Sequence, residues 1–266
     1  MSTVNTSTPS LMEAAHQVAK LAGDAALIHF RQGIAVDIKG DGTPVTAADR
    51  EAETLARQWI EKRFPDDGIL GEEFGEIRSS ARRKWILDPI DGTKSFIRGV
   101  PLWGTLVAVT EGDHVLAGVA YFPALNEWVV AGNQQGCFWN GSRCEVSTQS
   151  DVSKSVVLAT EERFREHPKR GRGWRKLAEA ALVTRTWGDC YGYLLVATGR
   201  AEVMVDGVLS AWDAAAVMPI IEEAGGVFTD WTGKPTVYGG SAIATNAALA
   251  RQARAFLQGG THSGAW

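Results

Sequence analysis

The feature that most restricts the possible folds is a change in the pattern of predicted elements near Ser150. Before this point two amphipathic helices are predicted, at 11–30 and 47–64. They precede a run of neighbouring strands at 84–88, 104–123, 127–132 and 136–141. Beyond it, predicted strands alternate with helices, the latter at about 174–182, 191–198, 213–226 and from 247 onward. Neighbouring strands favour helices packed on an antiparallel sheet, whereas alternation favours an α/β arrangement. We therefore predict a layered α-β-α-β-α sandwich, α+β in residues 10–148 and α/β in residues 150–260.

The two halves are predicted to pack as one compact domain over residues 1–266, with the functional site where they meet. No internal repeat and no low-complexity linker separates them. The composition, 45% hydrophobic and 22% charged, is ordinary for a globular protein, and 266 residues provide ample material for a core.

Charge and cysteine content argue against several classes of protein. The net charge is −4 and the longest basic run is Arg82–Lys84, so we expect no nucleic-acid partner. No apolar stretch approaches the roughly 20 residues that a membrane span needs. The start, MSTVNTSTPS, lacks the basic and apolar regions of a signal peptide. Cys137, Cys144 and Cys190 form no CxxC pair, which favours reduced thiols in a cytoplasmic protein.

The segment KWILDPIDGTKSF, residues 84–96, places Asp88 and Asp91 three positions apart directly after an apolar strand. Like charges at this spacing repel, and burying either one without a partner costs several kcal/mol or more. Divalent cations that prefer oxygen ligands would resolve this conflict. The following Asp91-Gly92-Thr93 resembles the opening of a helical turn, whose free backbone N–H groups accept anions. Taken alone, such a pair is more often structural, with one Asp capping a turn and the other solvated.

Three other acidic positions strengthen the functional interpretation. Glu72 and Glu73 end the short apolar run GILGEEF, and Asp213 follows Trp212 at a predicted helix start. Asp49 lies at the front of another helix, ten residues after Lys39. Each position has a structural explanation, such as helix capping for Asp213. The four together indicate an active site.

The segments GEE, WILDPIDGTKSF and WDAAAVMPIIEEAGG resemble the inositol monophosphatase-like family of metal-dependent, lithium-sensitive sugar and polyol phosphatases. The resemblance runs from about Leu11 to Leu257. It implies two or three Mg²⁺ ions per site, inhibition by Li⁺ and a homodimer. It also implies the ligands of the metal, which are Glu72, Asp88, Asp91, Asp213 and the carbonyl of Ile90.

The same resemblance assigns catalytic and phosphate-binding roles. Gly92 and Thr93 match the turn that holds the phosphate, and Thr93 also matches the residue that orients the attacking water. Asp49 matches the acid that assists this water, and Glu72 is counted with the catalytic groups. A phosphate monoester repels nucleophiles and hydrolyses extremely slowly without a catalyst, so neutralising its charge is the main requirement.

The segment TRTWGDCYGYLLVATGRAEVMVDG bears on the choice of substrate. It is most similar to the histidinol-phosphate phosphatases within the family, and the resemblance places Asp189 and Asp206 at substrate contacts. If they bind an ammonium or imidazole of the substrate, we expect them to act far from the phosphate. Histidinol phosphate carries an ammonium and an imidazole, which carboxylates would bind, whereas inositol phosphate offers only hydroxyls. Asp189 could instead cap the following helix. Arg185 is also a candidate substrate-binding residue, which could orient Asp189 or face solvent.

We predict a metal-dependent phosphomonoester hydrolase that converts L-histidinol phosphate to L-histidinol in histidine biosynthesis. The alternative is an inositol-1-monophosphatase or a broad-specificity sugar and polyol phosphatase. A non-catalytic relative would need a broken ligand set, which the sequence does not have. A bisphosphate nucleotidase or fructose bisphosphatase would need a second anion site, for which no clear basic cluster is present.

Overall fold

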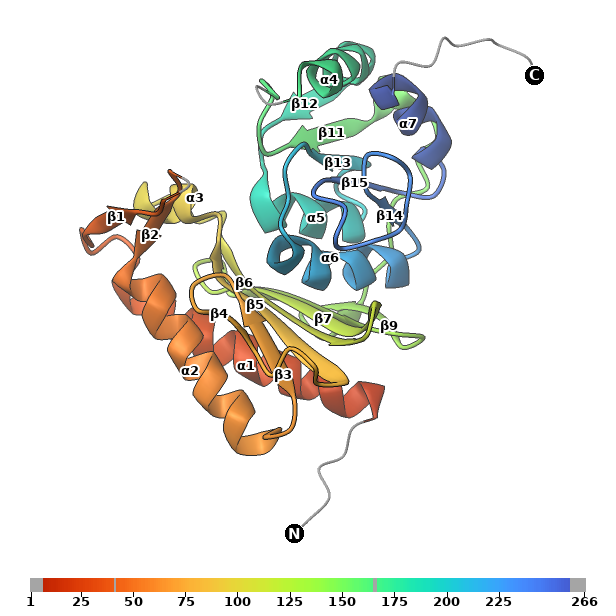
Figure 1. The fold of residues 1–266 in the computed structure, drawn as a ribbon. Coiled ribbons are helices and arrows are strands. Elements are labelled where there is room, and N and C mark those ends of the chain that lie inside the picture. The colour runs from red at the N-terminus through yellow and green to blue at the C-terminus, as the bar shows by residue number, and fades with distance from the viewer. Residues whose placement is uncertain (1–6, 41, 165–166, 259–266) are drawn as a thin grey trace.

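Helices and sheets alternate in layers through the computed structural model, which describes residues 7–40, 42–164 and 167–258 (Figure 1). An outer pair of helices covers the larger sheet, two further helices separate the two sheets, and a last pair covers the smaller sheet. This confirms the predicted layered sandwich. The helices are α1 (Thr8–His29), α2 (Ala47–Arg63), α3 (Thr93–Ile97), α4 (Pro168–Ala180), α5 (Asp189–Ala197), α6 (Ala211–Glu223) and α7 (Ala250–Gln258), with a 3₁₀ turn at Val152–Lys154.

The larger sheet has eight strands in the order β10-β9-β8-β7-β6-β5-β3-β4. Its pairs are antiparallel except β3 with β5, which is parallel, so the prediction of a purely antiparallel sheet was wrong for this pair. The cause is the hairpin from β3 to β4: the chain turns back at the sheet edge and then enters β5 on the inner side of β3. The strands are β3 (Gly68–Gly71), β4 (Gly75–Ile77), β5 (Arg83–Asp91), β6 (Gly104–Glu111), β7 (His114–Phe122), β8 (Glu127–Gly132), β9 (Gly136–Trp139) and β10 (Ser142–Arg143).

The smaller sheet has five strands in the order β12-β11-β13-β15-β14. Strand β11 pairs in parallel with β12 and β13, as the alternation of strands and helices predicts, while β15 pairs antiparallel with β13 and β14. The strands are β11 (Val156–Ala159), β12 (Val183–Arg185), β13 (Val203–Asp206), β14 (Val227–Thr229) and β15 (Ala242–Thr245). A separate hairpin of β1 (Val36–Ile38) and β2 (Pro44–Thr46) lies in the segment between the first two predicted helices, where the sequence analysis placed no strand.

Three hydrophobic clusters lie between the successive layers. One joins α1 and α2 to the larger sheet, and another joins α4 and α7 to the smaller sheet. The central cluster takes buried side chains from both halves, including Leu106 and Phe122 from the larger sheet and Met204 and Ala244 from the smaller one. Helix α6 lies in this cluster with the small residues 214–216, which allow close approach to the sheets. This shared core supports the single-domain interpretation, which stays a prediction.

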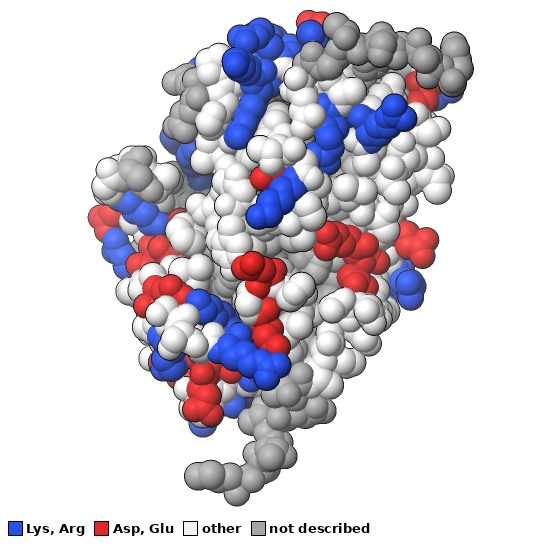
Figure 2. All heavy atoms as spheres, turned by 45° about the vertical axis from the view of Figure 1, so that its right-hand side comes forward, with Lys and Arg blue, Asp and Glu red and all other residues white. Residues whose placement is uncertain are grey.

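Helix α4 begins six residues before the predicted start at 174, because its first turns are basic and contain glycine instead of a clear apolar stripe. Its Lys169, Arg170, Arg172, Arg175 and Lys176 form a basic group that a search for unbroken basic runs did not detect. Figure 2 shows basic side chains gathered at the upper end of the molecule, the end that carries α4 in Figure 1.

No helix within residues 7–40, 42–164 and 167–258 is long and apolar enough to cross a membrane. The segments before residue 7 and after residue 258 lie outside the described residues.

Candidate active site

Strand β5 carries Asp88 and Asp91 at its end, and an irregularity in the strand decides how they lie. In a regular strand, residues three apart point to opposite faces. Opposite β6, however, Asp88 pairs with Leu106 and Asp91 pairs with Gly104, so β5 has one extra residue in this interval. A bulge of this kind re-aims side chains, and Pro89 at this point has no N–H to contribute to the ladder. Asp88 and Asp91 can therefore face the same space.

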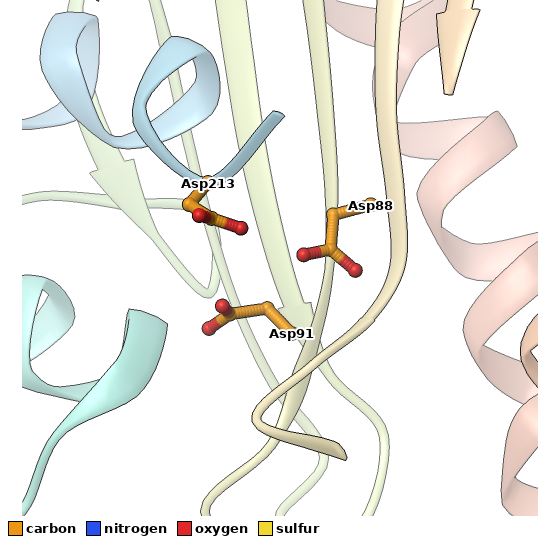
Figure 3. Close-up of side chains that lie close together, drawn as sticks. All are labelled: Asp88, Asp91 and Asp213. Carbon is orange, nitrogen blue, oxygen red and sulfur yellow. The ribbon is translucent and has the colours of Figure 1, made fainter. Parts of the chain in front are cut away.

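Asp213 approaches these two carboxylates from the first turn of α6. Its Oδ2 accepts the backbone N–H of Ser210 at 2.7 Å, which completes a capping box with the Ser210 side chain. The N-cap is therefore Ser210 and not Asp213, which closes the capping box from the third position of the helix. One oxygen of Asp213 can serve this cap while the side chain also faces Asp88 and Asp91. Carboxylate oxygens of Asp88, Asp91 and Asp213 all lie within 4.8 Å of one another, and the side chains point toward a common centre (Figure 3).

Burial and mutual repulsion make this cluster unfavourable without a cation. The pKa of Asp88 is raised well above its ordinary value by burial and then by the charges of Glu72, Asp91 and Asp213. Burial and the charge of Asp189 likewise raise the pKa of Asp91. Burial also raises the pKa of Asp213, to about 7. A bound divalent cation would remove this repulsion.

Glu72 lies in the turn after β3 and lines the same cavity as the three aspartates. In the structure its Oε1 accepts a hydrogen bond from Lys39 Nζ at 2.7 Å, and Oε1 of Glu73 accepts another from the same ammonium at 2.7 Å. Burial lowers the pKa of Lys39, but these two bonds outweigh it and raise the pKa. Lys39 thus supplies the positive charge beside Glu72, a contact that the sequence did not reveal.

The turn after β5 contains a left-handed glycine and leads directly into the short helix α3. Gly92 precedes α3 with φ 82°, a left-handed conformation that a side chain rarely adopts. The Thr93 hydroxyl donates to the carbonyl of Ile90 at 3.0 Å, and the first N–H groups of a helix lack partners within the helix. Lys94 also lines the cavity, so this turn adds a cation that the sequence analysis missed.

Asp49 is the third residue of α2 and caps it together with Thr46. Its Oδ2 accepts from the Thr46 backbone N–H at 2.7 Å and from the Thr46 hydroxyl at 2.6 Å. Its Oδ1 is buried and has no hydrogen-bond partner among the described residues. Burial raises the pKa of this carboxyl group. A buried carboxylate oxygen without a partner is costly, and this oxygen can accept a hydrogen bond from a water.

Asp189 and Asp206 line a small chamber of about 100 Å³ together with Asp91 and Asp213. Asp206 is buried and accepts the Tyr193 hydroxyl at 2.6 Å. Asp189 begins α5 with φ 50°, and its backbone N–H donates to Oγ1 of Thr160 at 2.8 Å. Burial and the charge of Asp206 raise the pKa of Asp189 to about 6. The structure thus joins both acids to the cluster of aspartates.

The position of Asp189 corrects one expectation. The sequence analysis placed this carboxylate far from the phosphate turn, but a Cβ added to Gly92 would lie 3.0 Å from its Oδ2. The reason is that Cys190, the next residue, donates its N–H to Oδ2 of Asp91 and so holds the start of α5 against the end of β5.

Arg185 lies away from this space. Its side chain is exposed on β12, where it donates to the carbonyl of Thr184 at 2.7 Å and lies 5.9 Å from the centre of the Trp187 ring. Of the two roles left open for Arg185, the structure shows the solvent-facing one. The main cavity, about 470 Å³, is also lined by residues that the sequence analysis did not select, among them Thr43, Thr160, Glu161, Phe164, His167 and Trp212.

Comparison with known proteins identifies this arrangement. A sequence model of the inositol monophosphatase family matches residues 8–259. The chain belongs to this family. It is 46% identical over 255 residues to a histidinol-phosphatase of Chlorobaculum parvum, covering 95% of this chain and 98% of that protein. It is 36% identical to a histidinol-phosphatase of Streptomyces coelicolor, covering 88% of this chain and 92% of that one.

A solved inositol monophosphatase of Zymomonas mobilis has a similar fold, with a TM-score of 0.86 and 32% identity, over 96% of this chain and 100% of the other. The family resemblance inferred from the sequence is therefore confirmed. The signatures of that resemblance are also the segments that converge on the cavity, since they include Glu72, Asp88, Asp91 and Asp213.

Proposed function

We propose that this phosphatase hydrolyses L-histidinol phosphate to L-histidinol with the help of bound Mg²⁺. The observation that carries the metal-dependent part is the convergence of Asp88, Asp91 and Asp213 within 4.8 Å. The part concerning the substrate rests on the carboxylates of Asp189 and Asp206 and on the relatives named histidinol-phosphatase. We also carry forward a cytoplasmic homodimer as a proposal that rests on the family resemblance.

The residues present fit a hard divalent cation. Asp88, Asp91, Asp213 and Glu72 offer carboxylate oxygens and Ile90 offers a carbonyl, which are the ligand types that Mg²⁺ prefers. A bound cation would offset the burial and repulsion that raise the pKa of Asp88. A water beside this cation would give the unpartnered Oδ1 of Asp49 a hydrogen-bond donor. When bound, two or three such ions would neutralise the phosphate dianion and make a nearby water more acidic.

The side chains around the cluster have separate tasks in this proposal. The free oxygen of Asp49 would accept a proton from the attacking water, and the Thr93 hydroxyl would orient this water. The turn at Gly92 and Thr93 would hold the phosphate oxygens through its backbone N–H groups, with Lys94 adding positive charge. The Glu72 carboxylate would bind the metal and act on the attacking water. Because its Oε1 accepts a hydrogen bond from Lys39, Glu72 must either keep this bond while it binds the metal or break it.

Removing divalent cations is expected to abolish phosphatase activity, and adding Mg²⁺ is expected to restore it. The physical reason is that the seven acidic side chains lining one cavity repel a phosphate dianion unless cations intervene: Glu72, Asp88, Asp91, Glu161, Asp189, Asp206 and Asp213. The measurement is phosphate release after chelation and after titration with Mg²⁺, and Li⁺ is expected to inhibit. Turnover that persists in excess chelator would contradict the proposal.

Histidinol phosphate has the right distribution of charge for this cavity. Its ammonium is on the carbon next to the one that carries the phosphate ester, so a site for it must lie close to the phosphate turn. Asp189 lies beside Gly92, where this ammonium would come. Asp206 lines the adjoining chamber and could accept an imidazole N–H. A substrate that offers only hydroxyls would leave these carboxylates without a charged partner.

A panel of four substrates tests the assignment: histidinol phosphate, inositol phosphate, fructose 1,6-bisphosphate and an adenosine bisphosphate. We expect the highest kcat/KM for histidinol phosphate. A higher value for inositol phosphate would favour the alternative, an inositol monophosphatase or broad-specificity polyol phosphatase. Inositol phosphate is the most informative competitor, because the similar solved structure from Zymomonas mobilis is an inositol monophosphatase.

Asp189→Asn is expected to lower kcat/KM for histidinol phosphate by about tenfold to a hundredfold more than for glycerol phosphate. A charge-assisted hydrogen bond between Asp189 and the substrate ammonium contributes roughly 1.5–3 kcal/mol. Glycerol phosphate has no ammonium, so the variant loses no such bond with that substrate. Asp151→Asn is the matched control, because it removes the same charge from an exposed turn outside the cavity. Equal losses on both substrates would show that Asp189 supports α5 or the metal cluster instead of reading the amine.

A further inference from the structure

Two of the three cysteines face each other at the β10 edge of the larger sheet, one on a strand and the other just after the neighbouring strand. Cys137 lies on β9, and Cys144 directly follows β10. Because Ser142 is opposite Trp139 and Arg143 is opposite Phe138, the next pair in this register is Cys144 with Cys137. The Cys144 N–H donates to the carbonyl of Cys137 at 3.0 Å, which continues the pairing to the cysteines themselves.

The two sulfur atoms are already in contact. Their Sγ–Sγ distance is 3.4 Å, with a hydrogen bond between the thiols. A disulfide bond is about 2.05 Å long, so closing it requires a displacement of little more than 1 Å shared by two side chains. Strand β10 is the last strand of the sheet, so a shift there disturbs no further strand. The geometry allows a bond without rearranging the fold.

The two thiols differ in a way that suits thiol–disulfide exchange. Cys137 is fully buried, whereas Cys144 is partly exposed and close to the charge of Arg200. The hydrogen bond between the thiols, the backbone of Trp139 and then Arg200 lower the pKa of Cys144, against burial and the charge of Glu145. The same hydrogen bond and burial raise the pKa of Cys137. Reactive cysteines are typically partly exposed and beside a cation. Cys144 is the attacking thiol on these grounds, and Cys137 is the resolving one.

We propose that Cys137 and Cys144 form a reversible disulfide by exchange with a small-molecule disulfide such as oxidised glutathione. The Cys144 thiolate attacks one sulfur of the small disulfide, breaks its S–S bond and releases one thiol. Cys137 then loses its proton and attacks Cys144 Sγ in the mixed disulfide, which releases the second thiol. The two protein thiols lose two electrons, and the small disulfide gains them.

The sequence supplies a direct readout. Arg143 lies between the two cysteines, so trypsin separates Cys137 and Cys144 into different peptides that stay joined only by a disulfide. The full-length reduced protein is equilibrated in glutathione buffers of increasing oxidised fraction, quenched by alkylation and digested without reductant. We expect the joined peptides to appear and two of the three alkylatable thiols to be lost, and dithiothreitol to reverse both changes.

Three single variants separate this exchange from incidental oxidation. Cys190→Ser should retain the cross-link, since Cys190 lies beside Asp91 and takes no part. Cys137→Ser should accumulate a glutathione adduct on Cys144, because the resolving thiol is missing, whereas Cys144→Ser should leave the buried Cys137 unmodified. The proposal is overturned if the unaltered chain yields separate peptides at the most oxidising ratio, or only a lasting adduct on Cys144.

Discussion

Replacing Asp88 by asparagine is expected to lower kcat/KM roughly 10³-fold or more and, at the same time, to raise the thermal midpoint of the metal-free protein. Metal ions contribute several kcal/mol to stabilising the charge in a phosphoryl transition state, and each 1.4 kcal/mol is about tenfold in rate. Asp88 is the most buried of the three clustered acids, at 2% exposed, and the charges of Glu72, Asp91 and Asp213 all act on it. Its loss should therefore weaken binding of more than one ion.

The stability half of this prediction follows from the sign of the pKa shift. The pKa of Asp88 is raised in the folded protein by burial and by neighbouring acids, so its charged form costs stability at neutral pH. Asparagine keeps the shape and removes that cost. The measurements are kcat/KM at saturating Mg²⁺ and thermal unfolding with and without the metal. We expect the stabilisation by Mg²⁺ to shrink in the variant, as linkage requires when the ligand binds less tightly.

Asp67→Asn is the matched control for Asp88→Asn. Asp67 is also buried, but it accepts Arg83 Nε at 2.7 Å and Trp85 Nε1 at 2.8 Å, so its charge is paired. This variant should lose stability and retain both metal response and turnover per folded molecule. A variant at Asp88 that behaved like the one at Asp67, destabilised with full activity, would refute the metal cluster.

Much of the site could be predicted because its residues are held by short local signals. Asp88 and Asp91 follow a strongly apolar strand, and Asp213 lies at a helix start that a serine at position 210 helps to cap. The facts that the sequence could not give are contacts between distant segments. The bulge that turns Asp88 and Asp91 to one side exists only relative to β6, and the Lys39 bonds to Glu72 and Glu73 require the β1–β2 hairpin to fold over the site.

The fold shows the same division between local and distant information. Hydrophobic periodicity predicted the long helices α1 and α2 within a few residues of their ends. The parallel pairing of β3 with β5 was missed, because strand direction depends on where the β4 hairpin lies in the sheet and not on any local pattern. Asp189 was placed too far from the phosphate turn for a similar reason: the hydrogen bond from Cys190 to Asp91 joins residues 99 positions apart.

Glu53→Ala is expected to lower the free energy of unfolding by about 3–5 kcal/mol, the usual cost of breaking a buried ion pair. The Glu53 side chain is fully buried in α2 and accepts Arg57 Nε at 2.7 Å. It also accepts the backbone N–H of Glu73 at 2.8 Å and that of Phe74 at 3.3 Å. Removing it leaves a buried guanidinium and two backbone donors without their acceptor. The measurement is equilibrium denaturant unfolding.

This residue also connects the core to the site, which makes a second consequence testable. A Cβ on Gly71 would lie 2.1 Å from Glu53 Oε1, so the turn that carries Glu72 packs directly on this carboxylate. The folded fraction of Glu53→Ala should therefore bind Mg²⁺ less tightly. Glu51→Ala is the control in the same helix: its side chain is 54% exposed and pairs with His29 at 2.8 Å, so its loss should cost at most about 1 kcal/mol and leave Mg²⁺ affinity unchanged. Similar small losses in the two variants would mean that Glu53 does not hold the turn, and that Glu72 is positioned by its own contacts with Leu87 and Lys39.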